Sequence, residues 1–171
     1  MATVDLSGAK TGESLEQRLA RLEDIEAIRN LKALYAHYCD HGYDPDGVAS
    51  LFTKDGIWES NVFGTYHGVE SIHRFMAGIS KVVVWALHYM TNPMIDVAPD
   101  GRSANASWLL FGPATMRRAA DPNALDAVIQ TGNYEDTLVK ESGRWKFQHL
   151  KVHLHCVSNL DQGWVRQQFR L

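Results

Sequence analysis

The feature that most constrains this chain is the change in residue pattern near position 80. Before it, apolar residues recur at spacings of three and four, as in amphipathic helices. After it, long runs rich in β-branched and aromatic residues are separated by turn signals such as Asp100-Gly101 and Ser142-Gly143. Helices followed by a meander of antiparallel strands predict an α+β domain. Such a sheet must curl around its helices to bury one face, and the concavity is a natural pocket.

The first helix is expected from Ser14 to about Gly42. Ser14 is the expected N-cap, Gln17 stands at the capping-box position, and Gly42 is a natural stop. The helix is long for a globular protein, so a break near Glu23-Asp24 is an open alternative.

The other elements follow from the same patterns. In the first half they are a short helix over 44–52 opened by Pro45, a strand over 56–60, an extended piece bracketed by Phe63-Gly64 and His67-Gly68, and a helix over 68–79. In the second half they are four extended runs, over 83–98, 103–116, 127–141 and 144–157, with a loop over 119–126. Asn92-Pro93 predicts a bulge or bend, because proline cannot donate to a central ladder.

Length and composition indicate one soluble domain. The chain has 171 residues, of which 45% are hydrophobic and 22% charged. We divide it into a flexible tail over 1–14, a domain over 15–160 and a C-terminal extension over 161–171. The net charge of −3, without a basic stripe, argues against a nucleic-acid partner. Without a signal-peptide pattern or a membrane-spanning apolar run, a cytoplasmic location is expected.

Two cysteines, Cys39 and Cys156, lie far apart without CxxC spacing. We expect buried free thiols rather than a disulfide framework or a zinc site. Motifs such as GxSxG, the P-loop, GxGxxG and HExxH do not occur in the sequence.

The strongest candidates for chemistry are His88 and Asp40. His88 lies in an apolar strand, and Asp40 ends the first helix, where the helix dipole disfavours a carboxylate. Such a conflict between charge and place is expected at functional sites. An Asp–His pair fixes the imidazole tautomer and raises its basicity, so that neutral histidine can take a proton from carbon. Tyr35, five residues before Asp40, is a candidate donor to a leaving oxygen. Each residue also has a structural alternative: His88 as a hydrogen-bonded core residue, Asp40 as a solvated helix end and Tyr35 as a core aromatic.

The last strand carries several histidines. By strict alternation His149, His153 and His155 share a face with Trp145 and Phe147, and this face is expected to form a polar pocket wall. The opposite face would then be an apolar outer patch formed by Leu150, Val152 and Leu154. His153 and His155 have a chelating spacing, but that strand offers no carboxylate or cysteine, so no metal site is expected.

Several segments in the correct order resemble the SnoaL-like family of the nuclear transport factor 2 (NTF2-like) superfamily. They are Ile25 to Asp40, the LFTKDGIW run over 51–58, Gly64 to Phe75, His88-Tyr-Met-Thr-Asn-Pro93, Gly132-Asn-Tyr-Glu-Asp136 and Gly143-Arg-Trp-Lys-Phe147. The resemblance covers roughly residues 15–158. It implies a cone-shaped NTF2-like fold, with N-terminal helices packed in a curved antiparallel sheet.

Within that family the chain is similar to scytalone dehydratase, lindane dehydrochlorinase and bile-acid 7α-dehydratase. These enzymes use an Asp–His dyad without metal or organic cofactor, and the matching residues are Asp40 and His88, with Tyr35 matching a bile-acid dehydratase tyrosine. Two positions differ from the bile-acid dehydratase pattern. An aspartate is replaced within Trp108-Leu-Leu-Phe111, and an arginine of the last strand is replaced by His153 or His155.

Two classes of function therefore remain open. One is a cofactor-independent lyase, a dehydratase or dehydrohalogenase acting on a small hydrophobic, cyclic substrate. The other is a non-catalytic binding or assembly module, and an isomerase or polyketide cyclase would use the same pocket. The aromatics expected in its wall are Tyr35, Tyr38, Trp58, Phe63, Trp108 and Phe111. The resemblance and the outer patch also predict a homo-oligomer, either a trimer or a dimer.

Overall fold

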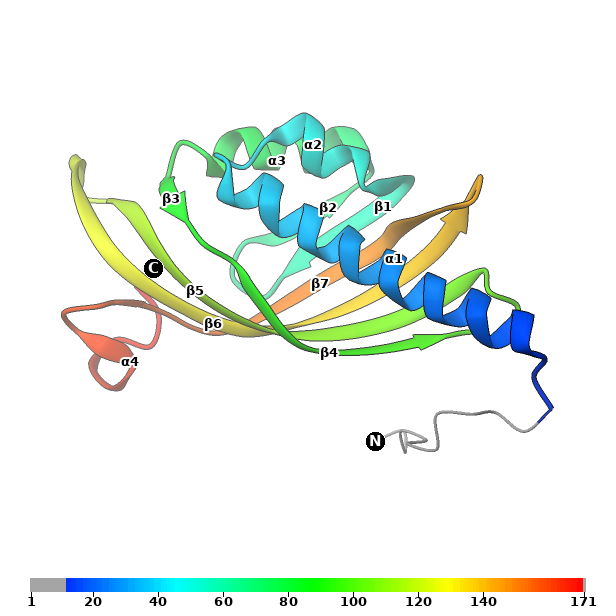
Figure 1. Ribbon diagram of the computed structural model, residues 1–171. Coiled ribbons are helices and arrows are strands. Elements are labelled where there is room, and N and C mark those ends of the chain that lie inside the picture. Colours follow the sequence, from blue (N-terminus) through cyan, green and yellow to red (C-terminus); the bar gives the residue numbers. More distant parts are fainter. Residues whose placement is uncertain (1–11, 171) are drawn as a thin grey trace.

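The computed structural model describes residues 12–170, which form helices first and long strands afterwards (Figure 1). The first half contains α1 (Leu15–Asp40), α2 (Pro45–Ser50), β1 (Phe52–Ser60), β2 (Gly64–His67) and α3 (Val69–Ile79). The second half contains β3 (Val83–Ala86), β4 (Tyr89–Val97), β5 (Ser103–Arg118), β6 (Asp121–Glu141), β7 (Arg144–Asn159) and the short α4 (Gly163–Arg166). The predicted order of helices and strands is confirmed.

The ends of α1 are set by local sequence. The Ser14 side chain accepts from the Gln17 backbone N–H, and the Gln17 side chain accepts in return from the Ser14 N–H, which completes the predicted capping box. At the other end, Gly42 takes a φ of 82°, a left-handed conformation that ends the helix. The helix is continuous between these points, so the break considered near Glu23-Asp24 does not occur.

The strands form one curved sheet in the order β2-β1-β7-β6-β5-β3, and β4 also pairs with β5. Most neighbours are antiparallel, as expected, but β1 and β7 run parallel. The expectation of an antiparallel sheet is therefore wrong at this one pair. The reason is that β1 and β7 are far apart in sequence, with β2 to β6 between them. No hairpin joins the two strands, and a long connection of this kind permits parallel pairing.

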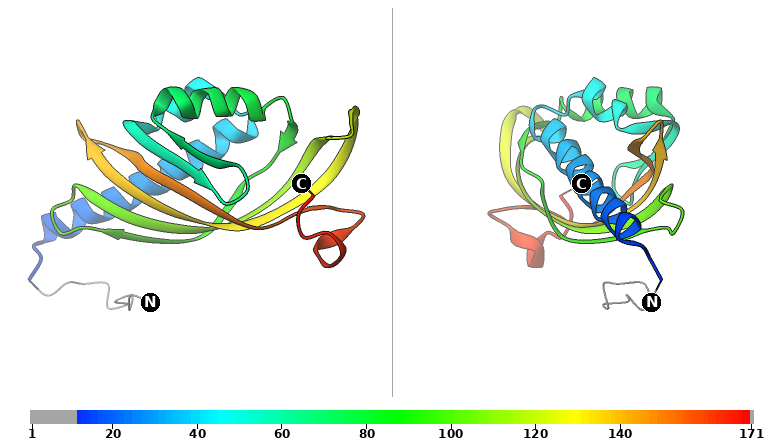
Figure 2. Two further views of the ribbon diagram at one scale, coloured as in Figure 1. Left: turned by 180° about the vertical axis from the view of Figure 1, so that it is seen from behind. Right: turned by 45° about the vertical axis from the view of Figure 1, so that its right-hand side comes forward.

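Helices α1, α2 and α3 occupy the concave side of the sheet. Figures 1 and 2 show α1 running across this side, with α2 and α3 lying together near its C-terminal end. The core lies between α1 and the sheet and includes Ile28, Leu31 and Phe147. No helix among residues 12–170 is both long enough and apolar enough to cross a membrane.

The extended run predicted over 83–98 is divided into two strands. Strand β3 ends at Ala86 and β4 begins at Tyr89, so His88 lies in the break between them. Further along, Asn92 takes a φ of 50° and the register with β5 shifts between Thr91 and Met94, which confirms the bulge predicted at Asn92-Pro93. The predicted loop over 119–126 is wrong, because β6 already begins at Asp121.

In the second half of β7, the buried and the exposed face are exchanged relative to the prediction. The register against β6 shifts where Phe147 faces Leu138 and His149 faces Thr137, so one extra residue is accommodated at Gln148. A bulge of this kind inverts the alternation of side chains beyond it. As a result the even-numbered side chains Leu150, Val152 and Leu154 are buried, while His153 and His155 are exposed. The outer apolar patch expected from these three residues is wrong, and the homo-oligomer stays a prediction.

The C-terminal segment returns along β7. The backbone of Val157 bonds to Gln168 and Arg170, and the Arg170 guanidinium lies 2.8 Å from the Asp126 carboxylate. The predicted tail over 1–14 falls mainly on residues 1–11, which lie outside the described residues.

Candidate active site

The end of α1 and the break between β3 and β4 bring Asp40 and His88 together. His88 Nδ1 lies 2.7 Å from Asp40 Oδ1, the distance of a strong charge-assisted hydrogen bond. The His88 side chain is 6% exposed and that of Asp40 is 18% exposed. The pair therefore lies inside the protein, although the two residues are 48 positions apart in sequence.

The bond to Asp40 fixes which His88 nitrogen carries the proton. A carboxylate oxygen only accepts, so Nδ1 is the donor, and in neutral imidazole Nε2 is then unprotonated. The Tyr43 hydroxyl lies 3.4 Å from Nε2 and donates toward it. This separation is longer than the roughly 2.7–3.0 Å of a strong O–H···N or O–H···O bond. A substrate proton can therefore replace the tyrosine at Nε2.

Tyr43 reaches the dyad because the chain reverses directly after α1. Gly42 and Tyr43 take φ values of 82° and 54°, both in the left-handed region. A bulky residue rarely adopts this conformation, and such strain is concentrated at functional sites. The Tyr43 ring meets the His88 ring edge-on, with centroids 5.8 Å apart. Burial raises the pKa of Tyr43 well above its ordinary value, so its hydroxyl stays protonated and remains a donor.

His88 itself is held by its neighbour in the chain. The Leu87 N–H donates to the Pro113 carbonyl at 3.0 Å, which anchors the break between β3 and β4 to strand β5. The Leu87 carbonyl lies against Gly112, at the place where a β-carbon would be. A residue with a side chain at 112 cannot coexist with this backbone path.

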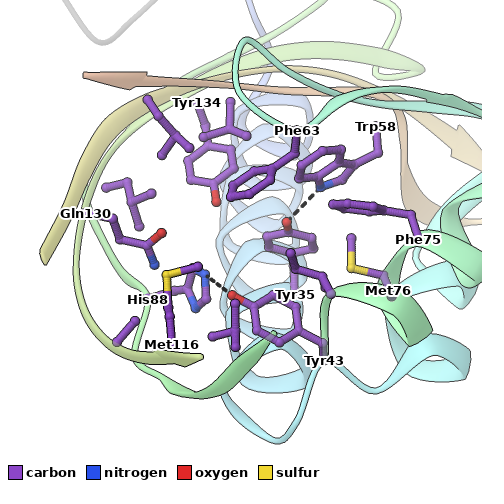
Figure 3. A pocket seen from close by; sticks show the side chains of 16 residues that line it. Tyr35, Tyr43, Trp58, Phe63, Phe75, Met76, His88, Met116, Gln130 and Tyr134 are labelled. Carbon is purple, nitrogen blue, oxygen red and sulfur yellow. Dashed lines mark hydrogen bonds between the residues drawn. The ribbon is translucent and has the colours of Figure 1, made fainter. Parts of the chain in front are cut away.

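His88, but not Asp40, borders an internal cavity between α1, α3 and the sheet (Figure 3). Its lining is mainly apolar and aromatic, with a few convergent polar groups, as in most small-molecule sites. The lining residues are Tyr35, Tyr43, Trp58, Phe63, Phe75, Met76, Ile79, Val83, His88, Leu110, Ala114, Met116, Gln130, Tyr134, Val152 and Leu154. On its other side His88 also borders a surface groove shared with His37, Asp40 and His41.

Tyr35 lies in the cavity wall but away from the Asp40 carboxylate. Five residues along a helix correspond to about 500° of rotation, so the two side chains leave α1 in different directions. The Tyr35 hydroxyl accepts a hydrogen bond from Trp58 Nε1 at 2.9 Å, and its own O–H remains a donor. Burial raises the pKa of Tyr35 well above its ordinary value. Its catalytic role stays a prediction, as does substrate binding by Trp58 and Phe63, which also line the cavity.

Four residues expected in the pocket wall lie elsewhere. Trp108 packs deeper in the core, whereas Phe111, three residues on, is 52% exposed on the outer face of the sheet. Alternation on β5 places residues an odd number apart on opposite faces, so the two never share a wall. His153 and His155 also face outward, because of the bulge in β7.

Tyr38 is the fifth residue that lies elsewhere. Its ring packs against Gly47 of α2, where an added β-carbon would be 2.5 Å from the tyrosine. It therefore joins α1 to α2 instead of lining the cavity.

Sequence reasoning did not identify a buried ion pair beneath the cavity. Lys32 Nζ lies 2.8 Å from Asp136 Oδ2, and both side chains are almost fully buried. Trp108 Nε1 donates to the same oxygen at 2.9 Å, and the ammonium lies 3.5 Å from the centre of the Tyr134 ring. Burial lowers the pKa of Lys32 to about 8 and raises that of Asp136. No periodic signal marks these residues, since each looks like an ordinary charged position of a helix or strand.

His153 and His155 of β7 have a spacing that can chelate a metal ion. Among residues 12–170, no group of three or more His, Cys, Asp or Glu side chains is placed to hold a metal ion. Cys39 and Cys156 are both buried free thiols.

The fold and this site define the class of protein. The chain matches the SnoaL-like domain over residues 20–151 and therefore belongs to the SnoaL-like family. The family membership predicted from sequence motifs is confirmed. None of the curated protein sequences matches the chain.

Solved structures give the same fold. A candidate scytalone dehydratase from Novosphingobium aromaticivorans DSM 12444 has a TM-score of 0.71 at 22% identity, with 82% of this chain and 89% of that chain covered. LinA-type3, a hexachlorocyclohexane dehydrochlorinase from Novosphingobium barchaimii LL02, has a TM-score of 0.72 at 20% identity, with coverage of 83% and 93%. An NTF2-like protein with a cystatin-like fold from Novosphingobium aromaticivorans has a TM-score of 0.62 at 19% identity, with coverage of 92% and 96%. At these identities the likeness shows the fold, which is the NTF2-like α+β fold predicted.

Proposed function

We propose that this protein is a cofactor-independent lyase that eliminates water or halide from a small hydrophobic, cyclic substrate. The observation that carries the proposal is the 2.7 Å bond between His88 Nδ1 and Asp40 Oδ1. It leaves the other imidazole nitrogen unprotonated beside an apolar cavity. This is the arrangement that a general base for carbon acids requires.

In the first part of the reaction, His88 Nε2 takes a proton from a carbon next to the leaving group. The C–H electron pair forms the new double bond, and the leaving group departs with the electrons of its own bond. Asp40 accepts from Nδ1 throughout and stabilises the imidazolium that forms. Proton transfer of this kind contributes roughly 10²–10⁴-fold to the rate.

Tyr43 supplies the acid when the leaving group is hydroxide. Its O–H proton passes to the departing oxygen to give water, and the His88 Nε2–H then returns a proton to the phenolate across the existing 3.4 Å contact. Both groups are thereby restored. Because base and acid lie side by side, they reach substituents on one face of the substrate, so the elimination is a syn elimination.

The aromatic side chains of the cavity wall favour a ring-bearing substrate, which must displace some of them because the enclosed volume is only about 40 Å³. Trp58, Phe63 and Phe75 lie in its wall, and their flat faces suit a cyclic hydrocarbon skeleton. Two proteins of the same fold are described as a candidate scytalone dehydratase and a hexachlorocyclohexane dehydrochlorinase, and both kinds of activity are eliminations.

The test uses β-hydroxycyclohexanone and hexachlorocyclohexane as probes, with products identified by mass spectrometry after incubation with chelator-treated protein. Conversion is expected with the native protein. His88→Ala and Asp40→Asn should abolish or strongly reduce it while the fold survives. The matched controls are His73→Ala and Asp46→Asn, because these residues form an exposed His–Asp pair at 3.2 Å outside the cavity. Near-normal conversion by His88→Ala would show that His88 is not the catalytic base.

The same assay distinguishes the other functions that this fold supports. Recovery of a bound probe without chemical change would indicate a binding module. A product of unchanged mass but altered structure would indicate an isomerase or cyclase. These two results each reject the lyase.

A further inference from the structure

We propose that the side-chain amide of Gln130 is the binding site for an acceptor oxygen of the substrate, specifically a carbonyl oxygen next to the carbon that His88 deprotonates. This inference rests on the proposed lyase function and adds the substrate class to it. The substrate is then a β-hydroxy or β-halo carbonyl compound.

The first observation is an unpaired donor. Gln130 is 9% exposed, and among the described residues its Nε2 has no hydrogen-bond partner. Leaving a buried donor unpaired is costly, so native proteins pair such groups with protein, ordered water or a ligand. The other polar groups of the wall differ in this respect, since Tyr35 is bonded to Trp58 and His88 is bonded to Asp40.

The second observation is how the amide is directed. Gln130 faces Gly112 on the neighbouring strand β5, and a β-carbon at 112 would lie 3.2 Å from Nε2. The glycine therefore leaves room for the amide over bare backbone. Figure 3 shows the amide turned into the cavity on the same side as the His88 ring, with the Tyr134 hydroxyl also pointing inward.

The shared glycine joins the two halves of the site. The Leu87 carbonyl and the Gln130 amide both lie close to the place where a β-carbon of Gly112 would be, so the backbone before the base and the unpaired donor meet at one residue. A substrate with its acidic carbon at His88 Nε2 then has its neighbouring carbonyl within the region that Gln130 faces.

The Gln130 amide can stabilise the enolate that forms during the elimination. When His88 removes a proton next to a carbonyl group, the C–H electron pair moves into the C=C–O⁻ enolate, and the negative charge gathers on oxygen. The Gln130 N–H groups bind that oxygen, and the enolate then expels the β substituent with its electron pair. A single preorganised donor of this kind contributes roughly 10²–10³-fold to turnover in other enzymes. A substrate without an acceptor oxygen leaves the amide unpaired and is bound less well.

The experiment separates binding from catalysis. The probes are carbonyl-labelled cyclohexanone and methylenecyclohexane, which match in shape but differ in having C=O or C=CH₂, and neither carries a leaving group. Calorimetry gives the affinity ratio, and infrared spectroscopy gives the carbonyl stretch of the bound ketone. One net hydrogen bond corresponds to a preference of about twofold to tenfold for the ketone. The native protein should show this preference and a lowered carbonyl frequency.

The variants locate the effect. Gln130→Leu should lose both the preference and the frequency shift, and Gln130→Glu should reverse the preference because a carboxylate only accepts. Gln148→Leu makes the same replacement at an exposed position of β7 and should change neither. Because Gln130→Leu removes a buried unpaired donor, its melting temperature should not fall, which checks that the fold is retained.

Two outcomes overturn the inference: equal affinity of the native protein for both probes, or an unchanged preference and frequency in Gln130→Leu. The lyase proposal fails separately. If the ketone is preferred through Gln130 but β-hydroxycyclohexanone is not converted, the acceptor site is supported and the lyase proposal is rejected. His88→Ala should retain the ketone preference while losing conversion.

Discussion

The carbonyl oxygen of Leu87 lies against Gly112, in the space that a β-carbon would fill. The Leu87 N–H is also bonded to the Pro113 carbonyl, so the residue before the base is fixed at both its N–H and its C=O group. The position of the His88 ring thus depends on the absence of a side chain on another strand.

Gly112→Ala adds only one methyl group, but it should therefore impair catalysis strongly. The added methyl must displace the Leu87 carbonyl, which costs about 1–3 kcal/mol of overpacking. It also moves His88, and a misplacement of about 1 Å can cost on the order of 10²-fold in rate. Urea unfolding and turnover of β-hydroxycyclohexanone measure the two effects. Gly78→Ala is the control, because a β-carbon there meets no atom within 4 Å and should raise helix stability slightly. Unchanged turnover in Gly112→Ala would show that Leu87 does not set the base.

Tyr35 and Tyr43, two of the three tyrosines that line the cavity, should respond differently to loss of their hydroxyls. Tyr43→Phe removes the proposed acid, so turnover with a hydroxide leaving group should fall by roughly 10²–10⁴-fold with little change in stability. Tyr35→Phe leaves Trp58 Nε1 without its acceptor, which should destabilise the fold by about 1–3 kcal/mol. Steady-state kinetics and urea unfolding on both variants check this. A Tyr43→Phe protein with normal turnover would instead favour Tyr35 as the acid.

The sequence was sufficient to predict the helices, the sheet and the Asp40–His88 pair. The helix period and capping signals are local, and the carboxylate at a helix C-terminus stood out as a conflict with the dipole. The pairing distance of 2.7 Å needed the structure, because nothing local brings residues 48 positions apart into contact.

What the sequence could not show depends on bulges and strained turns. One extra residue at Gln148 reverses the faces of β7, and strict alternation therefore misplaced His153 and His155. Tyr43 could not be predicted because it follows the expected helix stop, and no sequence signal marks the left-handed backbone that the structure shows there. A stricter use of alternation on β5 would have separated Trp108 from Phe111.

The buried pair of Lys32 and Asp136 should show strong coupling in a double-mutant cycle. Lys32→Met leaves a buried carboxylate without its cation, and such single removals cost about 3–5 kcal/mol. Adding Asp136→Leu removes the stranded charge, so the double variant should be more stable than Lys32→Met. Its remaining cost is the unpaired Trp108 Nε1, about 1–3 kcal/mol. Urea unfolding of the four proteins checks this, and losses that simply add would contradict it.

The same lysine should give stability an alkaline pH dependence. Burial lowers the pKa of folded Lys32 to about 8 from its ordinary 10.5. Between these values the unfolded chain binds a proton that the folded chain does not, so the free energy of unfolding rises with pH. The contribution of Lys32 is fully present above pH 10.5 and is lost as the pH falls through 8. Unfolding measured from pH 7 to pH 11 should therefore show native stability gaining on Lys32→Met as pH increases. Parallel curves for the two proteins would mean that Lys32 keeps an ordinary pKa in the fold, and that Asp136 and the Tyr134 ring offset the whole cost of its burial.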